Sequence, residues 1–175
     1  MVYEERLIRL EGVRILGGRF RNFSGNPTEY HKDGGVREFA VVVPESEVNK
    51  MMNDGIIVKR TKVYDDDGNV EEGVDGLPFI KVKVRFDSYR PPMIYMVSPG
   101  KTPQHLPEDM VDLLDASDIV DADMVIKHAE MKINGELRHP LYLRSLWANI
   151  EPDYFQEKYA RRDEERERGR EERDH

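Results

Sequence analysis

The chain of 175 residues has no cysteine, a single tryptophan and no long apolar run. The absence of cysteine excludes disulfides, thiolate metal sites and cysteine nucleophiles, and it fits a reducing compartment. No window is apolar for long enough to span a membrane, and the opening residues carry charges that a signal peptide lacks. We therefore expect a soluble intracellular protein that makes no membrane contact.

The charges that are present are mostly acidic and are spread along the chain. The formal net charge is −8, and charged residues make up 35% of the sequence. Residues 151–175 mix ten acidic with seven basic residues and have no apolar face to bury beyond Tyr159. We expect one domain over residues 1–150 and a charged helical or disordered tail over residues 151–175.

Within residues 1–150 the pattern indicates many short strands. Apolar alternation predicts a long first strand over residues 7–23, where Gly12, Gly17 and Gly18 mark bulges or bends at which a sheet curls. Further strands are expected at residues 36–43, 56–63, 77–86 and 93–97, a hairpin at residues 123–133 and 136–150 around Asn134-Gly135, and brief helices at residues 44–52 and 107–114.

Short strands, glycine-rich bends and the lack of strand–helix–strand alternation are typical of a small barrel or sandwich. We predict a mostly-β, OB-fold-like small barrel with two short helices and a C-terminal charged helical extension. The OB-fold is preferred because it combines a coiled first strand, a curled sheet and a face that binds nucleic acid.

The strand at residues 77–86 carries the clearest functional signal. From Ile80 onward apolar and basic residues alternate, so one face holds the apolar side chains and the other holds Lys81, Lys83 and Arg85. In an acidic chain, such a cationic row favours a polyanionic partner. The alternative is an ordinary solvated face of a half-buried strand.

Two further basic clusters strengthen the prediction of a polyanionic partner. In the first of these clusters, alternation places Arg19, Arg21 and Phe23 on one side of a strand, and the adjoining loop adds Tyr30, His31 and Lys32. The second cluster, at residues 59–62, contains Lys59, Arg60 and Lys62. Cations that follow phosphates and flat rings that stack on bases suit non-specific binding of single strands. The alternatives are core packing for Phe20 and Phe23 and a solvated sheet edge for residues 59–62.

Metal and catalytic motifs are weak by comparison. The stretch at residues 65–69 resembles a calcium loop, but its glycine comes too early and a hairpin turn explains it better. No nucleophile motif, paired-histidine motif or phosphate loop is present, so we expect no enzyme and no cofactor. Five aspartates are left as a candidate cation cluster or, alternatively, a solvated helix end and turn: Asp112, Asp115, Asp118, Asp121 and Asp123.

Four segments carry a resemblance to a known family: RNFSGNPTEY (21–30), PPMIYMVSPGKT (91–102), DMVDLLDASDI (109–119) and LYLRSLWANI (141–150). Over about residues 10–159 the chain resembles phage-encoded single-stranded-DNA-binding proteins. The resemblance implies an OB-like fold and a role in protecting or organising single strands during phage replication or recombination, in the cytoplasm of the bacterial host.

The tail departs from the pattern that this resemblance implies. Many single-strand-binding proteins end in a strongly acidic segment that recruits replication enzymes, whereas residues 160–175 mix Arg with Glu almost evenly. A replication or recombination protein and a second copy of the chain are therefore equal alternatives as partners of the tail.

Three functional hypotheses follow. The first is single-stranded DNA binding without sequence preference, through Arg19, Arg21, Phe23, Tyr30, Lys32, Lys59, Arg60, Lys81, Lys83, Arg85 and Tyr89. The second is a phage structural, assembly or protein-interaction module without DNA affinity. The third and weakest is a metal-dependent nuclease that uses Asp112 and Asp115.

Overall fold

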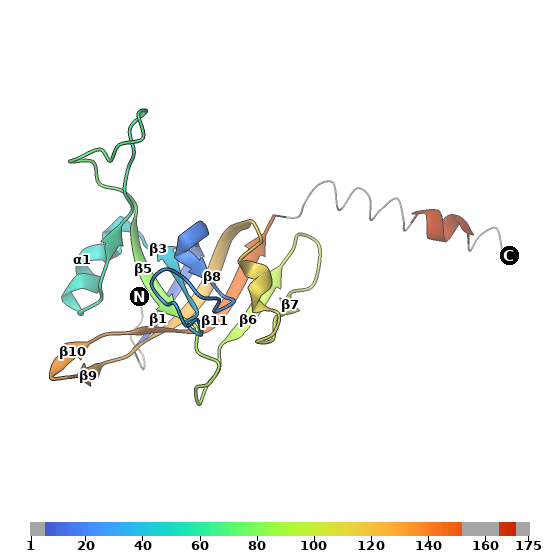
Figure 1. Cartoon of the computed structure of the whole chain (residues 1–175). Coiled ribbons are helices and arrows are strands. Elements are labelled where there is room, and N and C mark those ends of the chain that lie inside the picture. Colours follow the sequence, from blue (N-terminus) through green and yellow to red (C-terminus); the bar gives the residue numbers. More distant parts are fainter. Residues whose placement is uncertain (1–5, 152–164, 171–175) are drawn as a thin grey trace.

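The computed structural model describes residues 6–151 and 165–170, and it is built mainly from strands (Figure 1). The strands are β1 (Leu7–Val13), β2 (Arg21–Asn22), β3 (Glu38–Val42), β4 (Lys59–Arg60), β5 (Pro78–Lys83), β6 (Met93–Val97), β7 (Gln104–His105), β8 (Ile119–His128), β9 (Met131–Ile133), β10 (Glu136–Arg138) and β11 (Leu141–Ile150). The helical elements among them are α1 (Glu45–Asn53) and two 3-10 turns, η1 (Gly18–Phe20) and η2 (Val111–Leu114).

Nine of these strands form one mixed sheet, in which six follow the order β1-β8-β11-β5-β3-β2. Of the other three, β4 pairs with β5, β6 pairs with β11, and β7 pairs with β6. Strand β11 lies at its centre, antiparallel to β8 on one side and parallel to β5 and β6 on the other. The mostly-β, OB-like class predicted from the sequence is confirmed.

The chain just beyond β1 meets β3, on the far side of the sheet order. The amide of Leu16 donates to the carbonyl of Ala40 at 2.9 Å, and the amide of Val42 donates to the carbonyl of Arg14 at 2.9 Å. The sheet therefore curls until the segment just beyond β1 touches β3, but the contact is too short to close a barrel along the strands. A partly open five-stranded barrel of this kind is typical of the OB-fold.

A bulge in β1 makes this curl possible. The pairing of β1 with β8 shifts register between Leu10 and Val13, and Gly12 within the shift has a φ of 59°. The amide of Gly12 donates to Asp123 Oδ1 at 2.8 Å. Because a bulge bends its strand and increases the local twist, β1 can leave β8 and reach β3.

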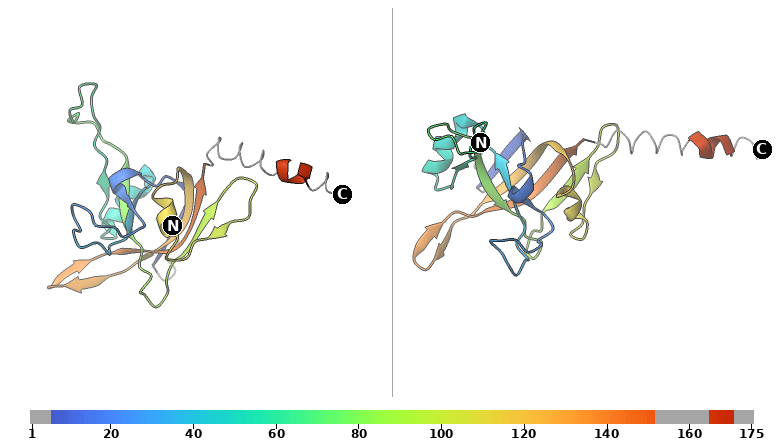
Figure 2. Two further views of the ribbon diagram at one scale, coloured as in Figure 1. Left: turned by 45° about the vertical axis from the view of Figure 1, so that its right-hand side comes forward. Right: turned by 45° about the horizontal axis from the view of Figure 1, so that its top comes forward.

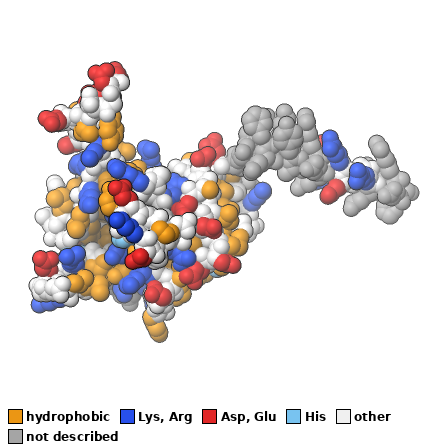
Figure 3. Space-filling model, in the orientation of Figure 1, with side chains coloured by type: hydrophobic (Ala, Val, Ile, Leu, Met, Phe, Trp, Pro, Cys, Tyr) orange, Lys and Arg blue, Asp and Glu red, His pale blue; other side chains and the backbone are white. Residues whose placement is uncertain are grey.

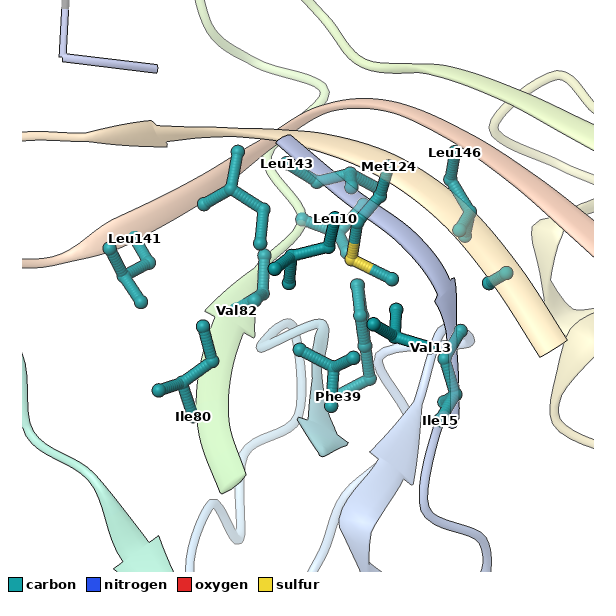
Figure 4. Packing of buried hydrophobic residues seen from close by; sticks show 14 of the residues in the cluster. Leu10, Val13, Ile15, Phe39, Ile80, Val82, Met124, Leu141, Leu143 and Leu146 are labelled. Atoms are coloured by element: carbon teal, nitrogen blue, oxygen red, sulfur yellow. The ribbon is translucent and has the colours of Figure 1, made fainter. Parts of the chain in front are cut away.

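The core lies inside the curl (Figure 4), where side chains from β1, β3, β5, β8 and β11 meet. In β5, Ile80 and Val82 are fully buried while Lys81 and Lys83 are exposed, so the predicted alternation is confirmed. Helix α1 closes one end of the core with Met51, which is also fully buried. Burying one such side chain contributes about 1.5–3 kcal/mol to the free energy of unfolding. This gain holds each strand with its apolar face toward the core.

Several predicted boundaries are wrong. The first strand ends at Val13 instead of continuing to residue 23, and only Lys59–Arg60 of residues 56–63 is a strand. The predicted helix at residues 107–114 is reduced to η2, whereas the helix at residues 44–52 is confirmed as α1. Of the predicted tail helix, residues 165–170 are helical, and residues 152–164 and 171–175 lie outside the described residues.

Strands β9 and β10 form the β9–β10 arm, a hairpin over residues 131–138 that stands out from the sheet (Figure 2). Its turn is the predicted one, because Asn134 and Gly135 have φ angles of 52° and 82°, as a two-residue hairpin turn requires. No helix in the described parts of the chain is both long and apolar enough to cross a membrane.

Two histidines join at the base of the β9–β10 arm. The Nε2 atom of His128 lies 3.0 Å from Nδ1 of His139, and His128 is only 5% exposed. Burial lowers the pKa of His128 below its ordinary value of 6.5, and electrostatic interactions with His139 and Arg6 act in the same direction, against those with Asp54 and Glu130. The folded chain therefore favours the neutral form of His128 more strongly than the unfolded chain does.

This pair predicts a loss of stability in mild acid. Because the unfolded chain takes up a proton on His128 at a higher pH than the folded chain does, the free energy of unfolding falls as pH drops below about 6.5. We expect the thermal midpoint of the wild type to fall as the pH is lowered from 7.5 to 5. The midpoint of His128→Gln should fall less over the same range. His105→Gln, which changes an exposed histidine, is the control; an equal decline in all three proteins would contradict the prediction.

Candidate nucleic-acid interface

The solvent face of the sheet carries a row of side chains across four strands, of which those on β8, β11 and β5 are basic or aromatic. In the pairing register, Lys127 of β8 lies opposite Leu7 of β1 and opposite Tyr142 of β11, and Tyr142 lies opposite Lys83 of β5. Residues directly opposite each other in a ladder share a face, so these side chains all point outward. Arg85, two residues beyond Lys83, places its guanidinium 5.7 Å from the ring centre of Tyr142.

A hollow of about 630 Å³ opens beside this row. We call it the basic groove; it is lined by Leu7, Arg85, Ser88, Tyr89, Arg90, Lys127, Ala129, Met131, Tyr142, Leu143 and Arg144. Four of these side chains are cationic, two are tyrosines and none is acidic. The groove therefore combines positive charge with flat rings, as a single-strand binder requires.

The cations of the basic groove are little neutralised by the protein. Arg85 makes an exposed ion pair with Asp87 at 3.9 Å, which contributes little in water. Within residues 6–151 and 165–170, no carboxylate lies within 4.0 Å of a charged nitrogen of Arg90, Lys127 or Arg144. Among the described residues, no carboxylate therefore competes with an anion for these three side chains.

The cationic row of β5 leads from the basic groove toward two other predicted clusters. Lys81 and Lys83 are exposed, and Phe79, on the same face, lies opposite Lys59 of β4. The ring of Phe79 packs edge-on against Phe20 at 5.4 Å, and the guanidinium of Arg19 lies 4.9 Å above the Phe20 ring. The face that includes the groove therefore gathers Arg19, Lys59, Lys81, Lys83 and Arg85 from all three predicted basic segments, and Tyr89 joins them in the groove.

Three other predicted residues have internal partners instead. Phe23 is fully buried and stacks on Phe39 at 5.0 Å, as its core alternative required. Arg60 makes two hydrogen bonds to the carboxylate of Glu45, at 2.6 and 2.9 Å. Tyr30 and Lys32 are exposed in the loop between β2 and β3, and neither lines the basic groove.

Arg21 is the third residue with internal partners, and its contacts are structural. Its guanidinium donates to the carbonyls of Ser117 at 2.8 Å, Leu114 at 3.1 Å, Leu16 at 3.3 Å and Ile15 at 3.4 Å. Burial lowers its pKa, against the raising effect of nearby carboxylates. Arg21 thus ties the end of the first strand to the turn after η2, and we do not place it in the interface.

Three of the five aspartates of the candidate cation cluster, Asp115, Asp121 and Asp123, accept hydrogen bonds within the fold. Asp115 accepts hydrogen bonds from the amides of Phe23 and Ser24 at 2.7 and 3.0 Å, and Asp121 accepts one from Asn149 at 2.5 Å. In the part of the chain that the structure describes, no three His, Asp or Glu side chains are grouped to hold a metal ion. Asp65 likewise accepts from the amides of Asp67 and Asn69, which makes residues 65–69 a hairpin turn, as predicted.

Sequence reasoning missed four of the residues that make up the basic groove. Arg90, Lys127, Tyr142 and Arg144 each stand apart from other lysines and arginines in the sequence, so none belongs to a cationic cluster there. The register of β8, β11 and β5 places Lys127 and Tyr142 in line with Lys83, and Arg90 and Arg144 join them in the lining of the groove.

A curled, partly open sheet with a basic and aromatic outer face defines a class of nucleic-acid-binding β-proteins. Residues 2–169 match the model of the family described as "Putative phage ssDNA-binding domain". Because the match covers nearly the whole chain, the protein belongs to this family of phage single-stranded-DNA-binding domains, and the family resemblance seen in the sequence is confirmed.

No curated protein matches the chain. Among solved structures, it is similar to a single-stranded DNA-binding protein from bacteriophage Enc34, with 10% identity, a TM-score of 0.49, and coverage of 86% of this chain and 84% of the other. The same phage protein in complex with ssDNA aligns with 12% identity and a TM-score of 0.49, over 86% of this chain and 90% of the other. A C-terminal truncation of it aligns with 13% identity and a TM-score of 0.47, over 86% and 89%.

The internal role of Arg21 predicts that its loss weakens the fold. Arg21→Met removes the hydrogen bonds to four carbonyls and should lower the free energy of unfolding by about 1–3 kcal/mol, measured by chemical denaturation. Arg19→Met, which changes an exposed neighbour, should shift stability by at most about 0.5 kcal/mol. Wild-type stability in Arg21→Met would show that these hydrogen bonds do not hold the first strand to η2.

Proposed function

We propose that this chain binds single-stranded DNA without sequence preference, through the basic groove and the cationic row of β5. The observation that carries the proposal is the meeting of four cations and two tyrosines in one groove without an acidic side chain, on a chain with a net charge of −8. Membership of the phage family supports the choice of single-stranded DNA as the polyanion.

Each kind of side chain in the basic groove suits one part of the ligand. Arg85, Arg90, Lys127 and Arg144 would follow the phosphates, while Tyr89 and Tyr142 would stack on bases. Tyr89 is 98% exposed, which is the state that a ring available for stacking needs. Contacts to phosphates and to ring faces carry no base identity, so binding would be independent of sequence.

The overall acidity does not prevent this binding because charge acts locally in salt solution. At physiological salt the screening length is about 8 Å, so a phosphate in the basic groove is influenced mainly by the side chains that line it. A dense group of acidic side chains sits at the tip of the loop between β4 and β5, which stands well out from the body of the protein (Figure 3).

We further propose that the chain acts as an accessory to phage replication or recombination in the cytoplasm of the host bacterium. Coating exposed single strands is the action that an open groove and sequence-independent contacts suit best. A second copy of the chain, or a replication or recombination protein that contacts residues 151–175, would complete the assembly. The proposal needs no cofactor and assigns no catalytic residue.

Binding should weaken steeply with salt. If the four groove cations contact phosphates, the slope of log affinity against log salt should be about −3, and affinity for oligo-dT should fall about 50-fold between 50 and 200 mM salt. Fluorescence anisotropy of a labelled oligonucleotide measures this. Negligible binding at both salt concentrations, together with a large DNA-free oligomer, would favour a structural or assembly role instead.

Removal of two groove charges should flatten this salt dependence. In Lys127→Gln/Arg144→Gln, the slope should become shallower by about 1.4 and the affinity at 0.1 M salt should fall about 25-fold, because two counterion-releasing contacts are lost. Lys62→Gln, which removes an exposed charge outside the groove, is the control and should bind like the wild type. An unchanged slope in the double variant would exclude the basic groove as the phosphate path.

A further inference from the structure

A second group of rings lies on the sheet, outside the basic groove. Trp147 of β11 lies opposite Tyr95 of β6, and Tyr95 lies opposite His105 of β7. The Trp147 and Tyr95 rings are stacked, with centres 5.4 Å apart and an interplanar angle of 10°, and the His105 ring is 5.5 Å from Tyr95. We call these three residues the aromatic row.

The aromatic row is not part of the core. Trp147, the single tryptophan of the chain, is 37% exposed, while its neighbours Leu146 and Ala148 are fully buried. Its side chain therefore points to the solvent face, where a large ring is not needed to fill the interior. Partly exposed tryptophan beside tyrosine is typical of a surface that binds flat or apolar groups.

A bulge in β11 puts the aromatic row on the same face as the groove. Tyr142 and Trp147 are five positions apart, and in a regular strand an odd separation would place them on opposite faces. The pairing of β11 with β8 shifts between Leu143 and Ser145, so β11 has one extra residue at Arg144. This bulge returns Tyr142 and Trp147 to the same face of the sheet. Both rings consequently face outward, roughly 13 Å apart along the sheet, because their partners Lys127 and Asp123 are four residues apart on β8.

The charges around the aromatic row differ from those of the basic groove. Trp147 lies opposite Asp123 of β8, and the next outward position of β11, Asn149, is hydrogen-bonded to Asp121. Arg144, which lines the basic groove, lies on β11 between Tyr142 and Trp147, and Lys101 is exposed in the loop that joins β6 to β7. Few phosphate contacts are available here, so rings are the main binding groups of this surface.

We propose that Trp147, Tyr95 and His105 form a second base-stacking site, which extends the path of single-stranded DNA from the basic groove along β11. The inference rests on the proposed function and adds to it the direction of the strand and the length of the site. Because OB-folds contact about 4–16 nucleotides, the groove alone would suit the short end of that range and both sites together the longer end.

The single tryptophan provides a direct test in the full-length protein. Titration with oligo-dT of about 16 nucleotides should quench the fluorescence of Trp147, since a stacked base changes its surroundings. Anisotropy of a labelled strand, recorded on the same samples, reports binding independently. Binding without a change in tryptophan fluorescence would overturn the second site and leave the proposed function intact, whereas no binding of any strand would overturn both.

Substitutions separate stacking from packing within the sheet. Trp147→Leu keeps apolar bulk without a flat ring and should weaken binding of the long strand at least about fivefold, while Trp147→Phe should bind nearly like the wild type. The slope of affinity against salt should be unchanged, because no phosphate contact is removed. Tyr64→Ala, which removes an exposed ring in the loop after β4, is the control and should bind like the wild type.

Strand length completes the test. With oligo-dT of about 5 nucleotides, Trp147→Leu and the wild type should bind equally, because a short strand occupies the basic groove alone. Equal losses on short and long strands would overturn the extension along β11. Wild-type affinity of Trp147→Leu for the long strand would also overturn it.

Discussion

The pairing of strand β11 is the constraint on which the fold and its outer face both depend. It bonds to β8 along nearly its whole length and to β5 and β6 on its other side, so it joins the two halves of the sheet. Leu141, Leu143, Leu146 and Ala148 point inward and are buried. Because the inward positions are set by the core, the outward positions are set too, and Tyr142 is one of them.

The distribution of acidic groups explains how an acidic chain can present a basic groove. Many carboxylates near the body of the protein are engaged as hydrogen-bond acceptors: Asp115 binds two amides, Asp123 binds the amide of Gly12, and Glu45 binds Arg60. Others stand on the loop between β4 and β5. The net charge therefore says little about the field in the groove, where the lining residues dominate.

The parts of the fold that the sequence predicts well are those set by local pattern. The alternation in β5 requires one apolar face to be buried, and this is enough to expose Lys81 and Lys83. A similar pattern around Arg21 and Phe23 misleads, because β2 is only two residues long and both side chains turn inward. Two of the four carbonyls that accept from Arg21, those of Leu114 and Ser117, are 93 and 96 positions away, and no local rule could find them.

The basic groove contains both contacts that the sequence could have predicted and contacts that it could not. Asn134-Gly135 fixes the register of its hairpin, and positions symmetric about that turn pair from Ile133 with Glu136 outward to Lys127 with Tyr142. That half of the groove was accessible from the sequence, because a two-residue turn carries its register along both strands. The pairing of Tyr142 with Lys83 could not be predicted from the sequence. The two strands are parallel and joined through a long connection, and its path depends on how the whole sheet packs.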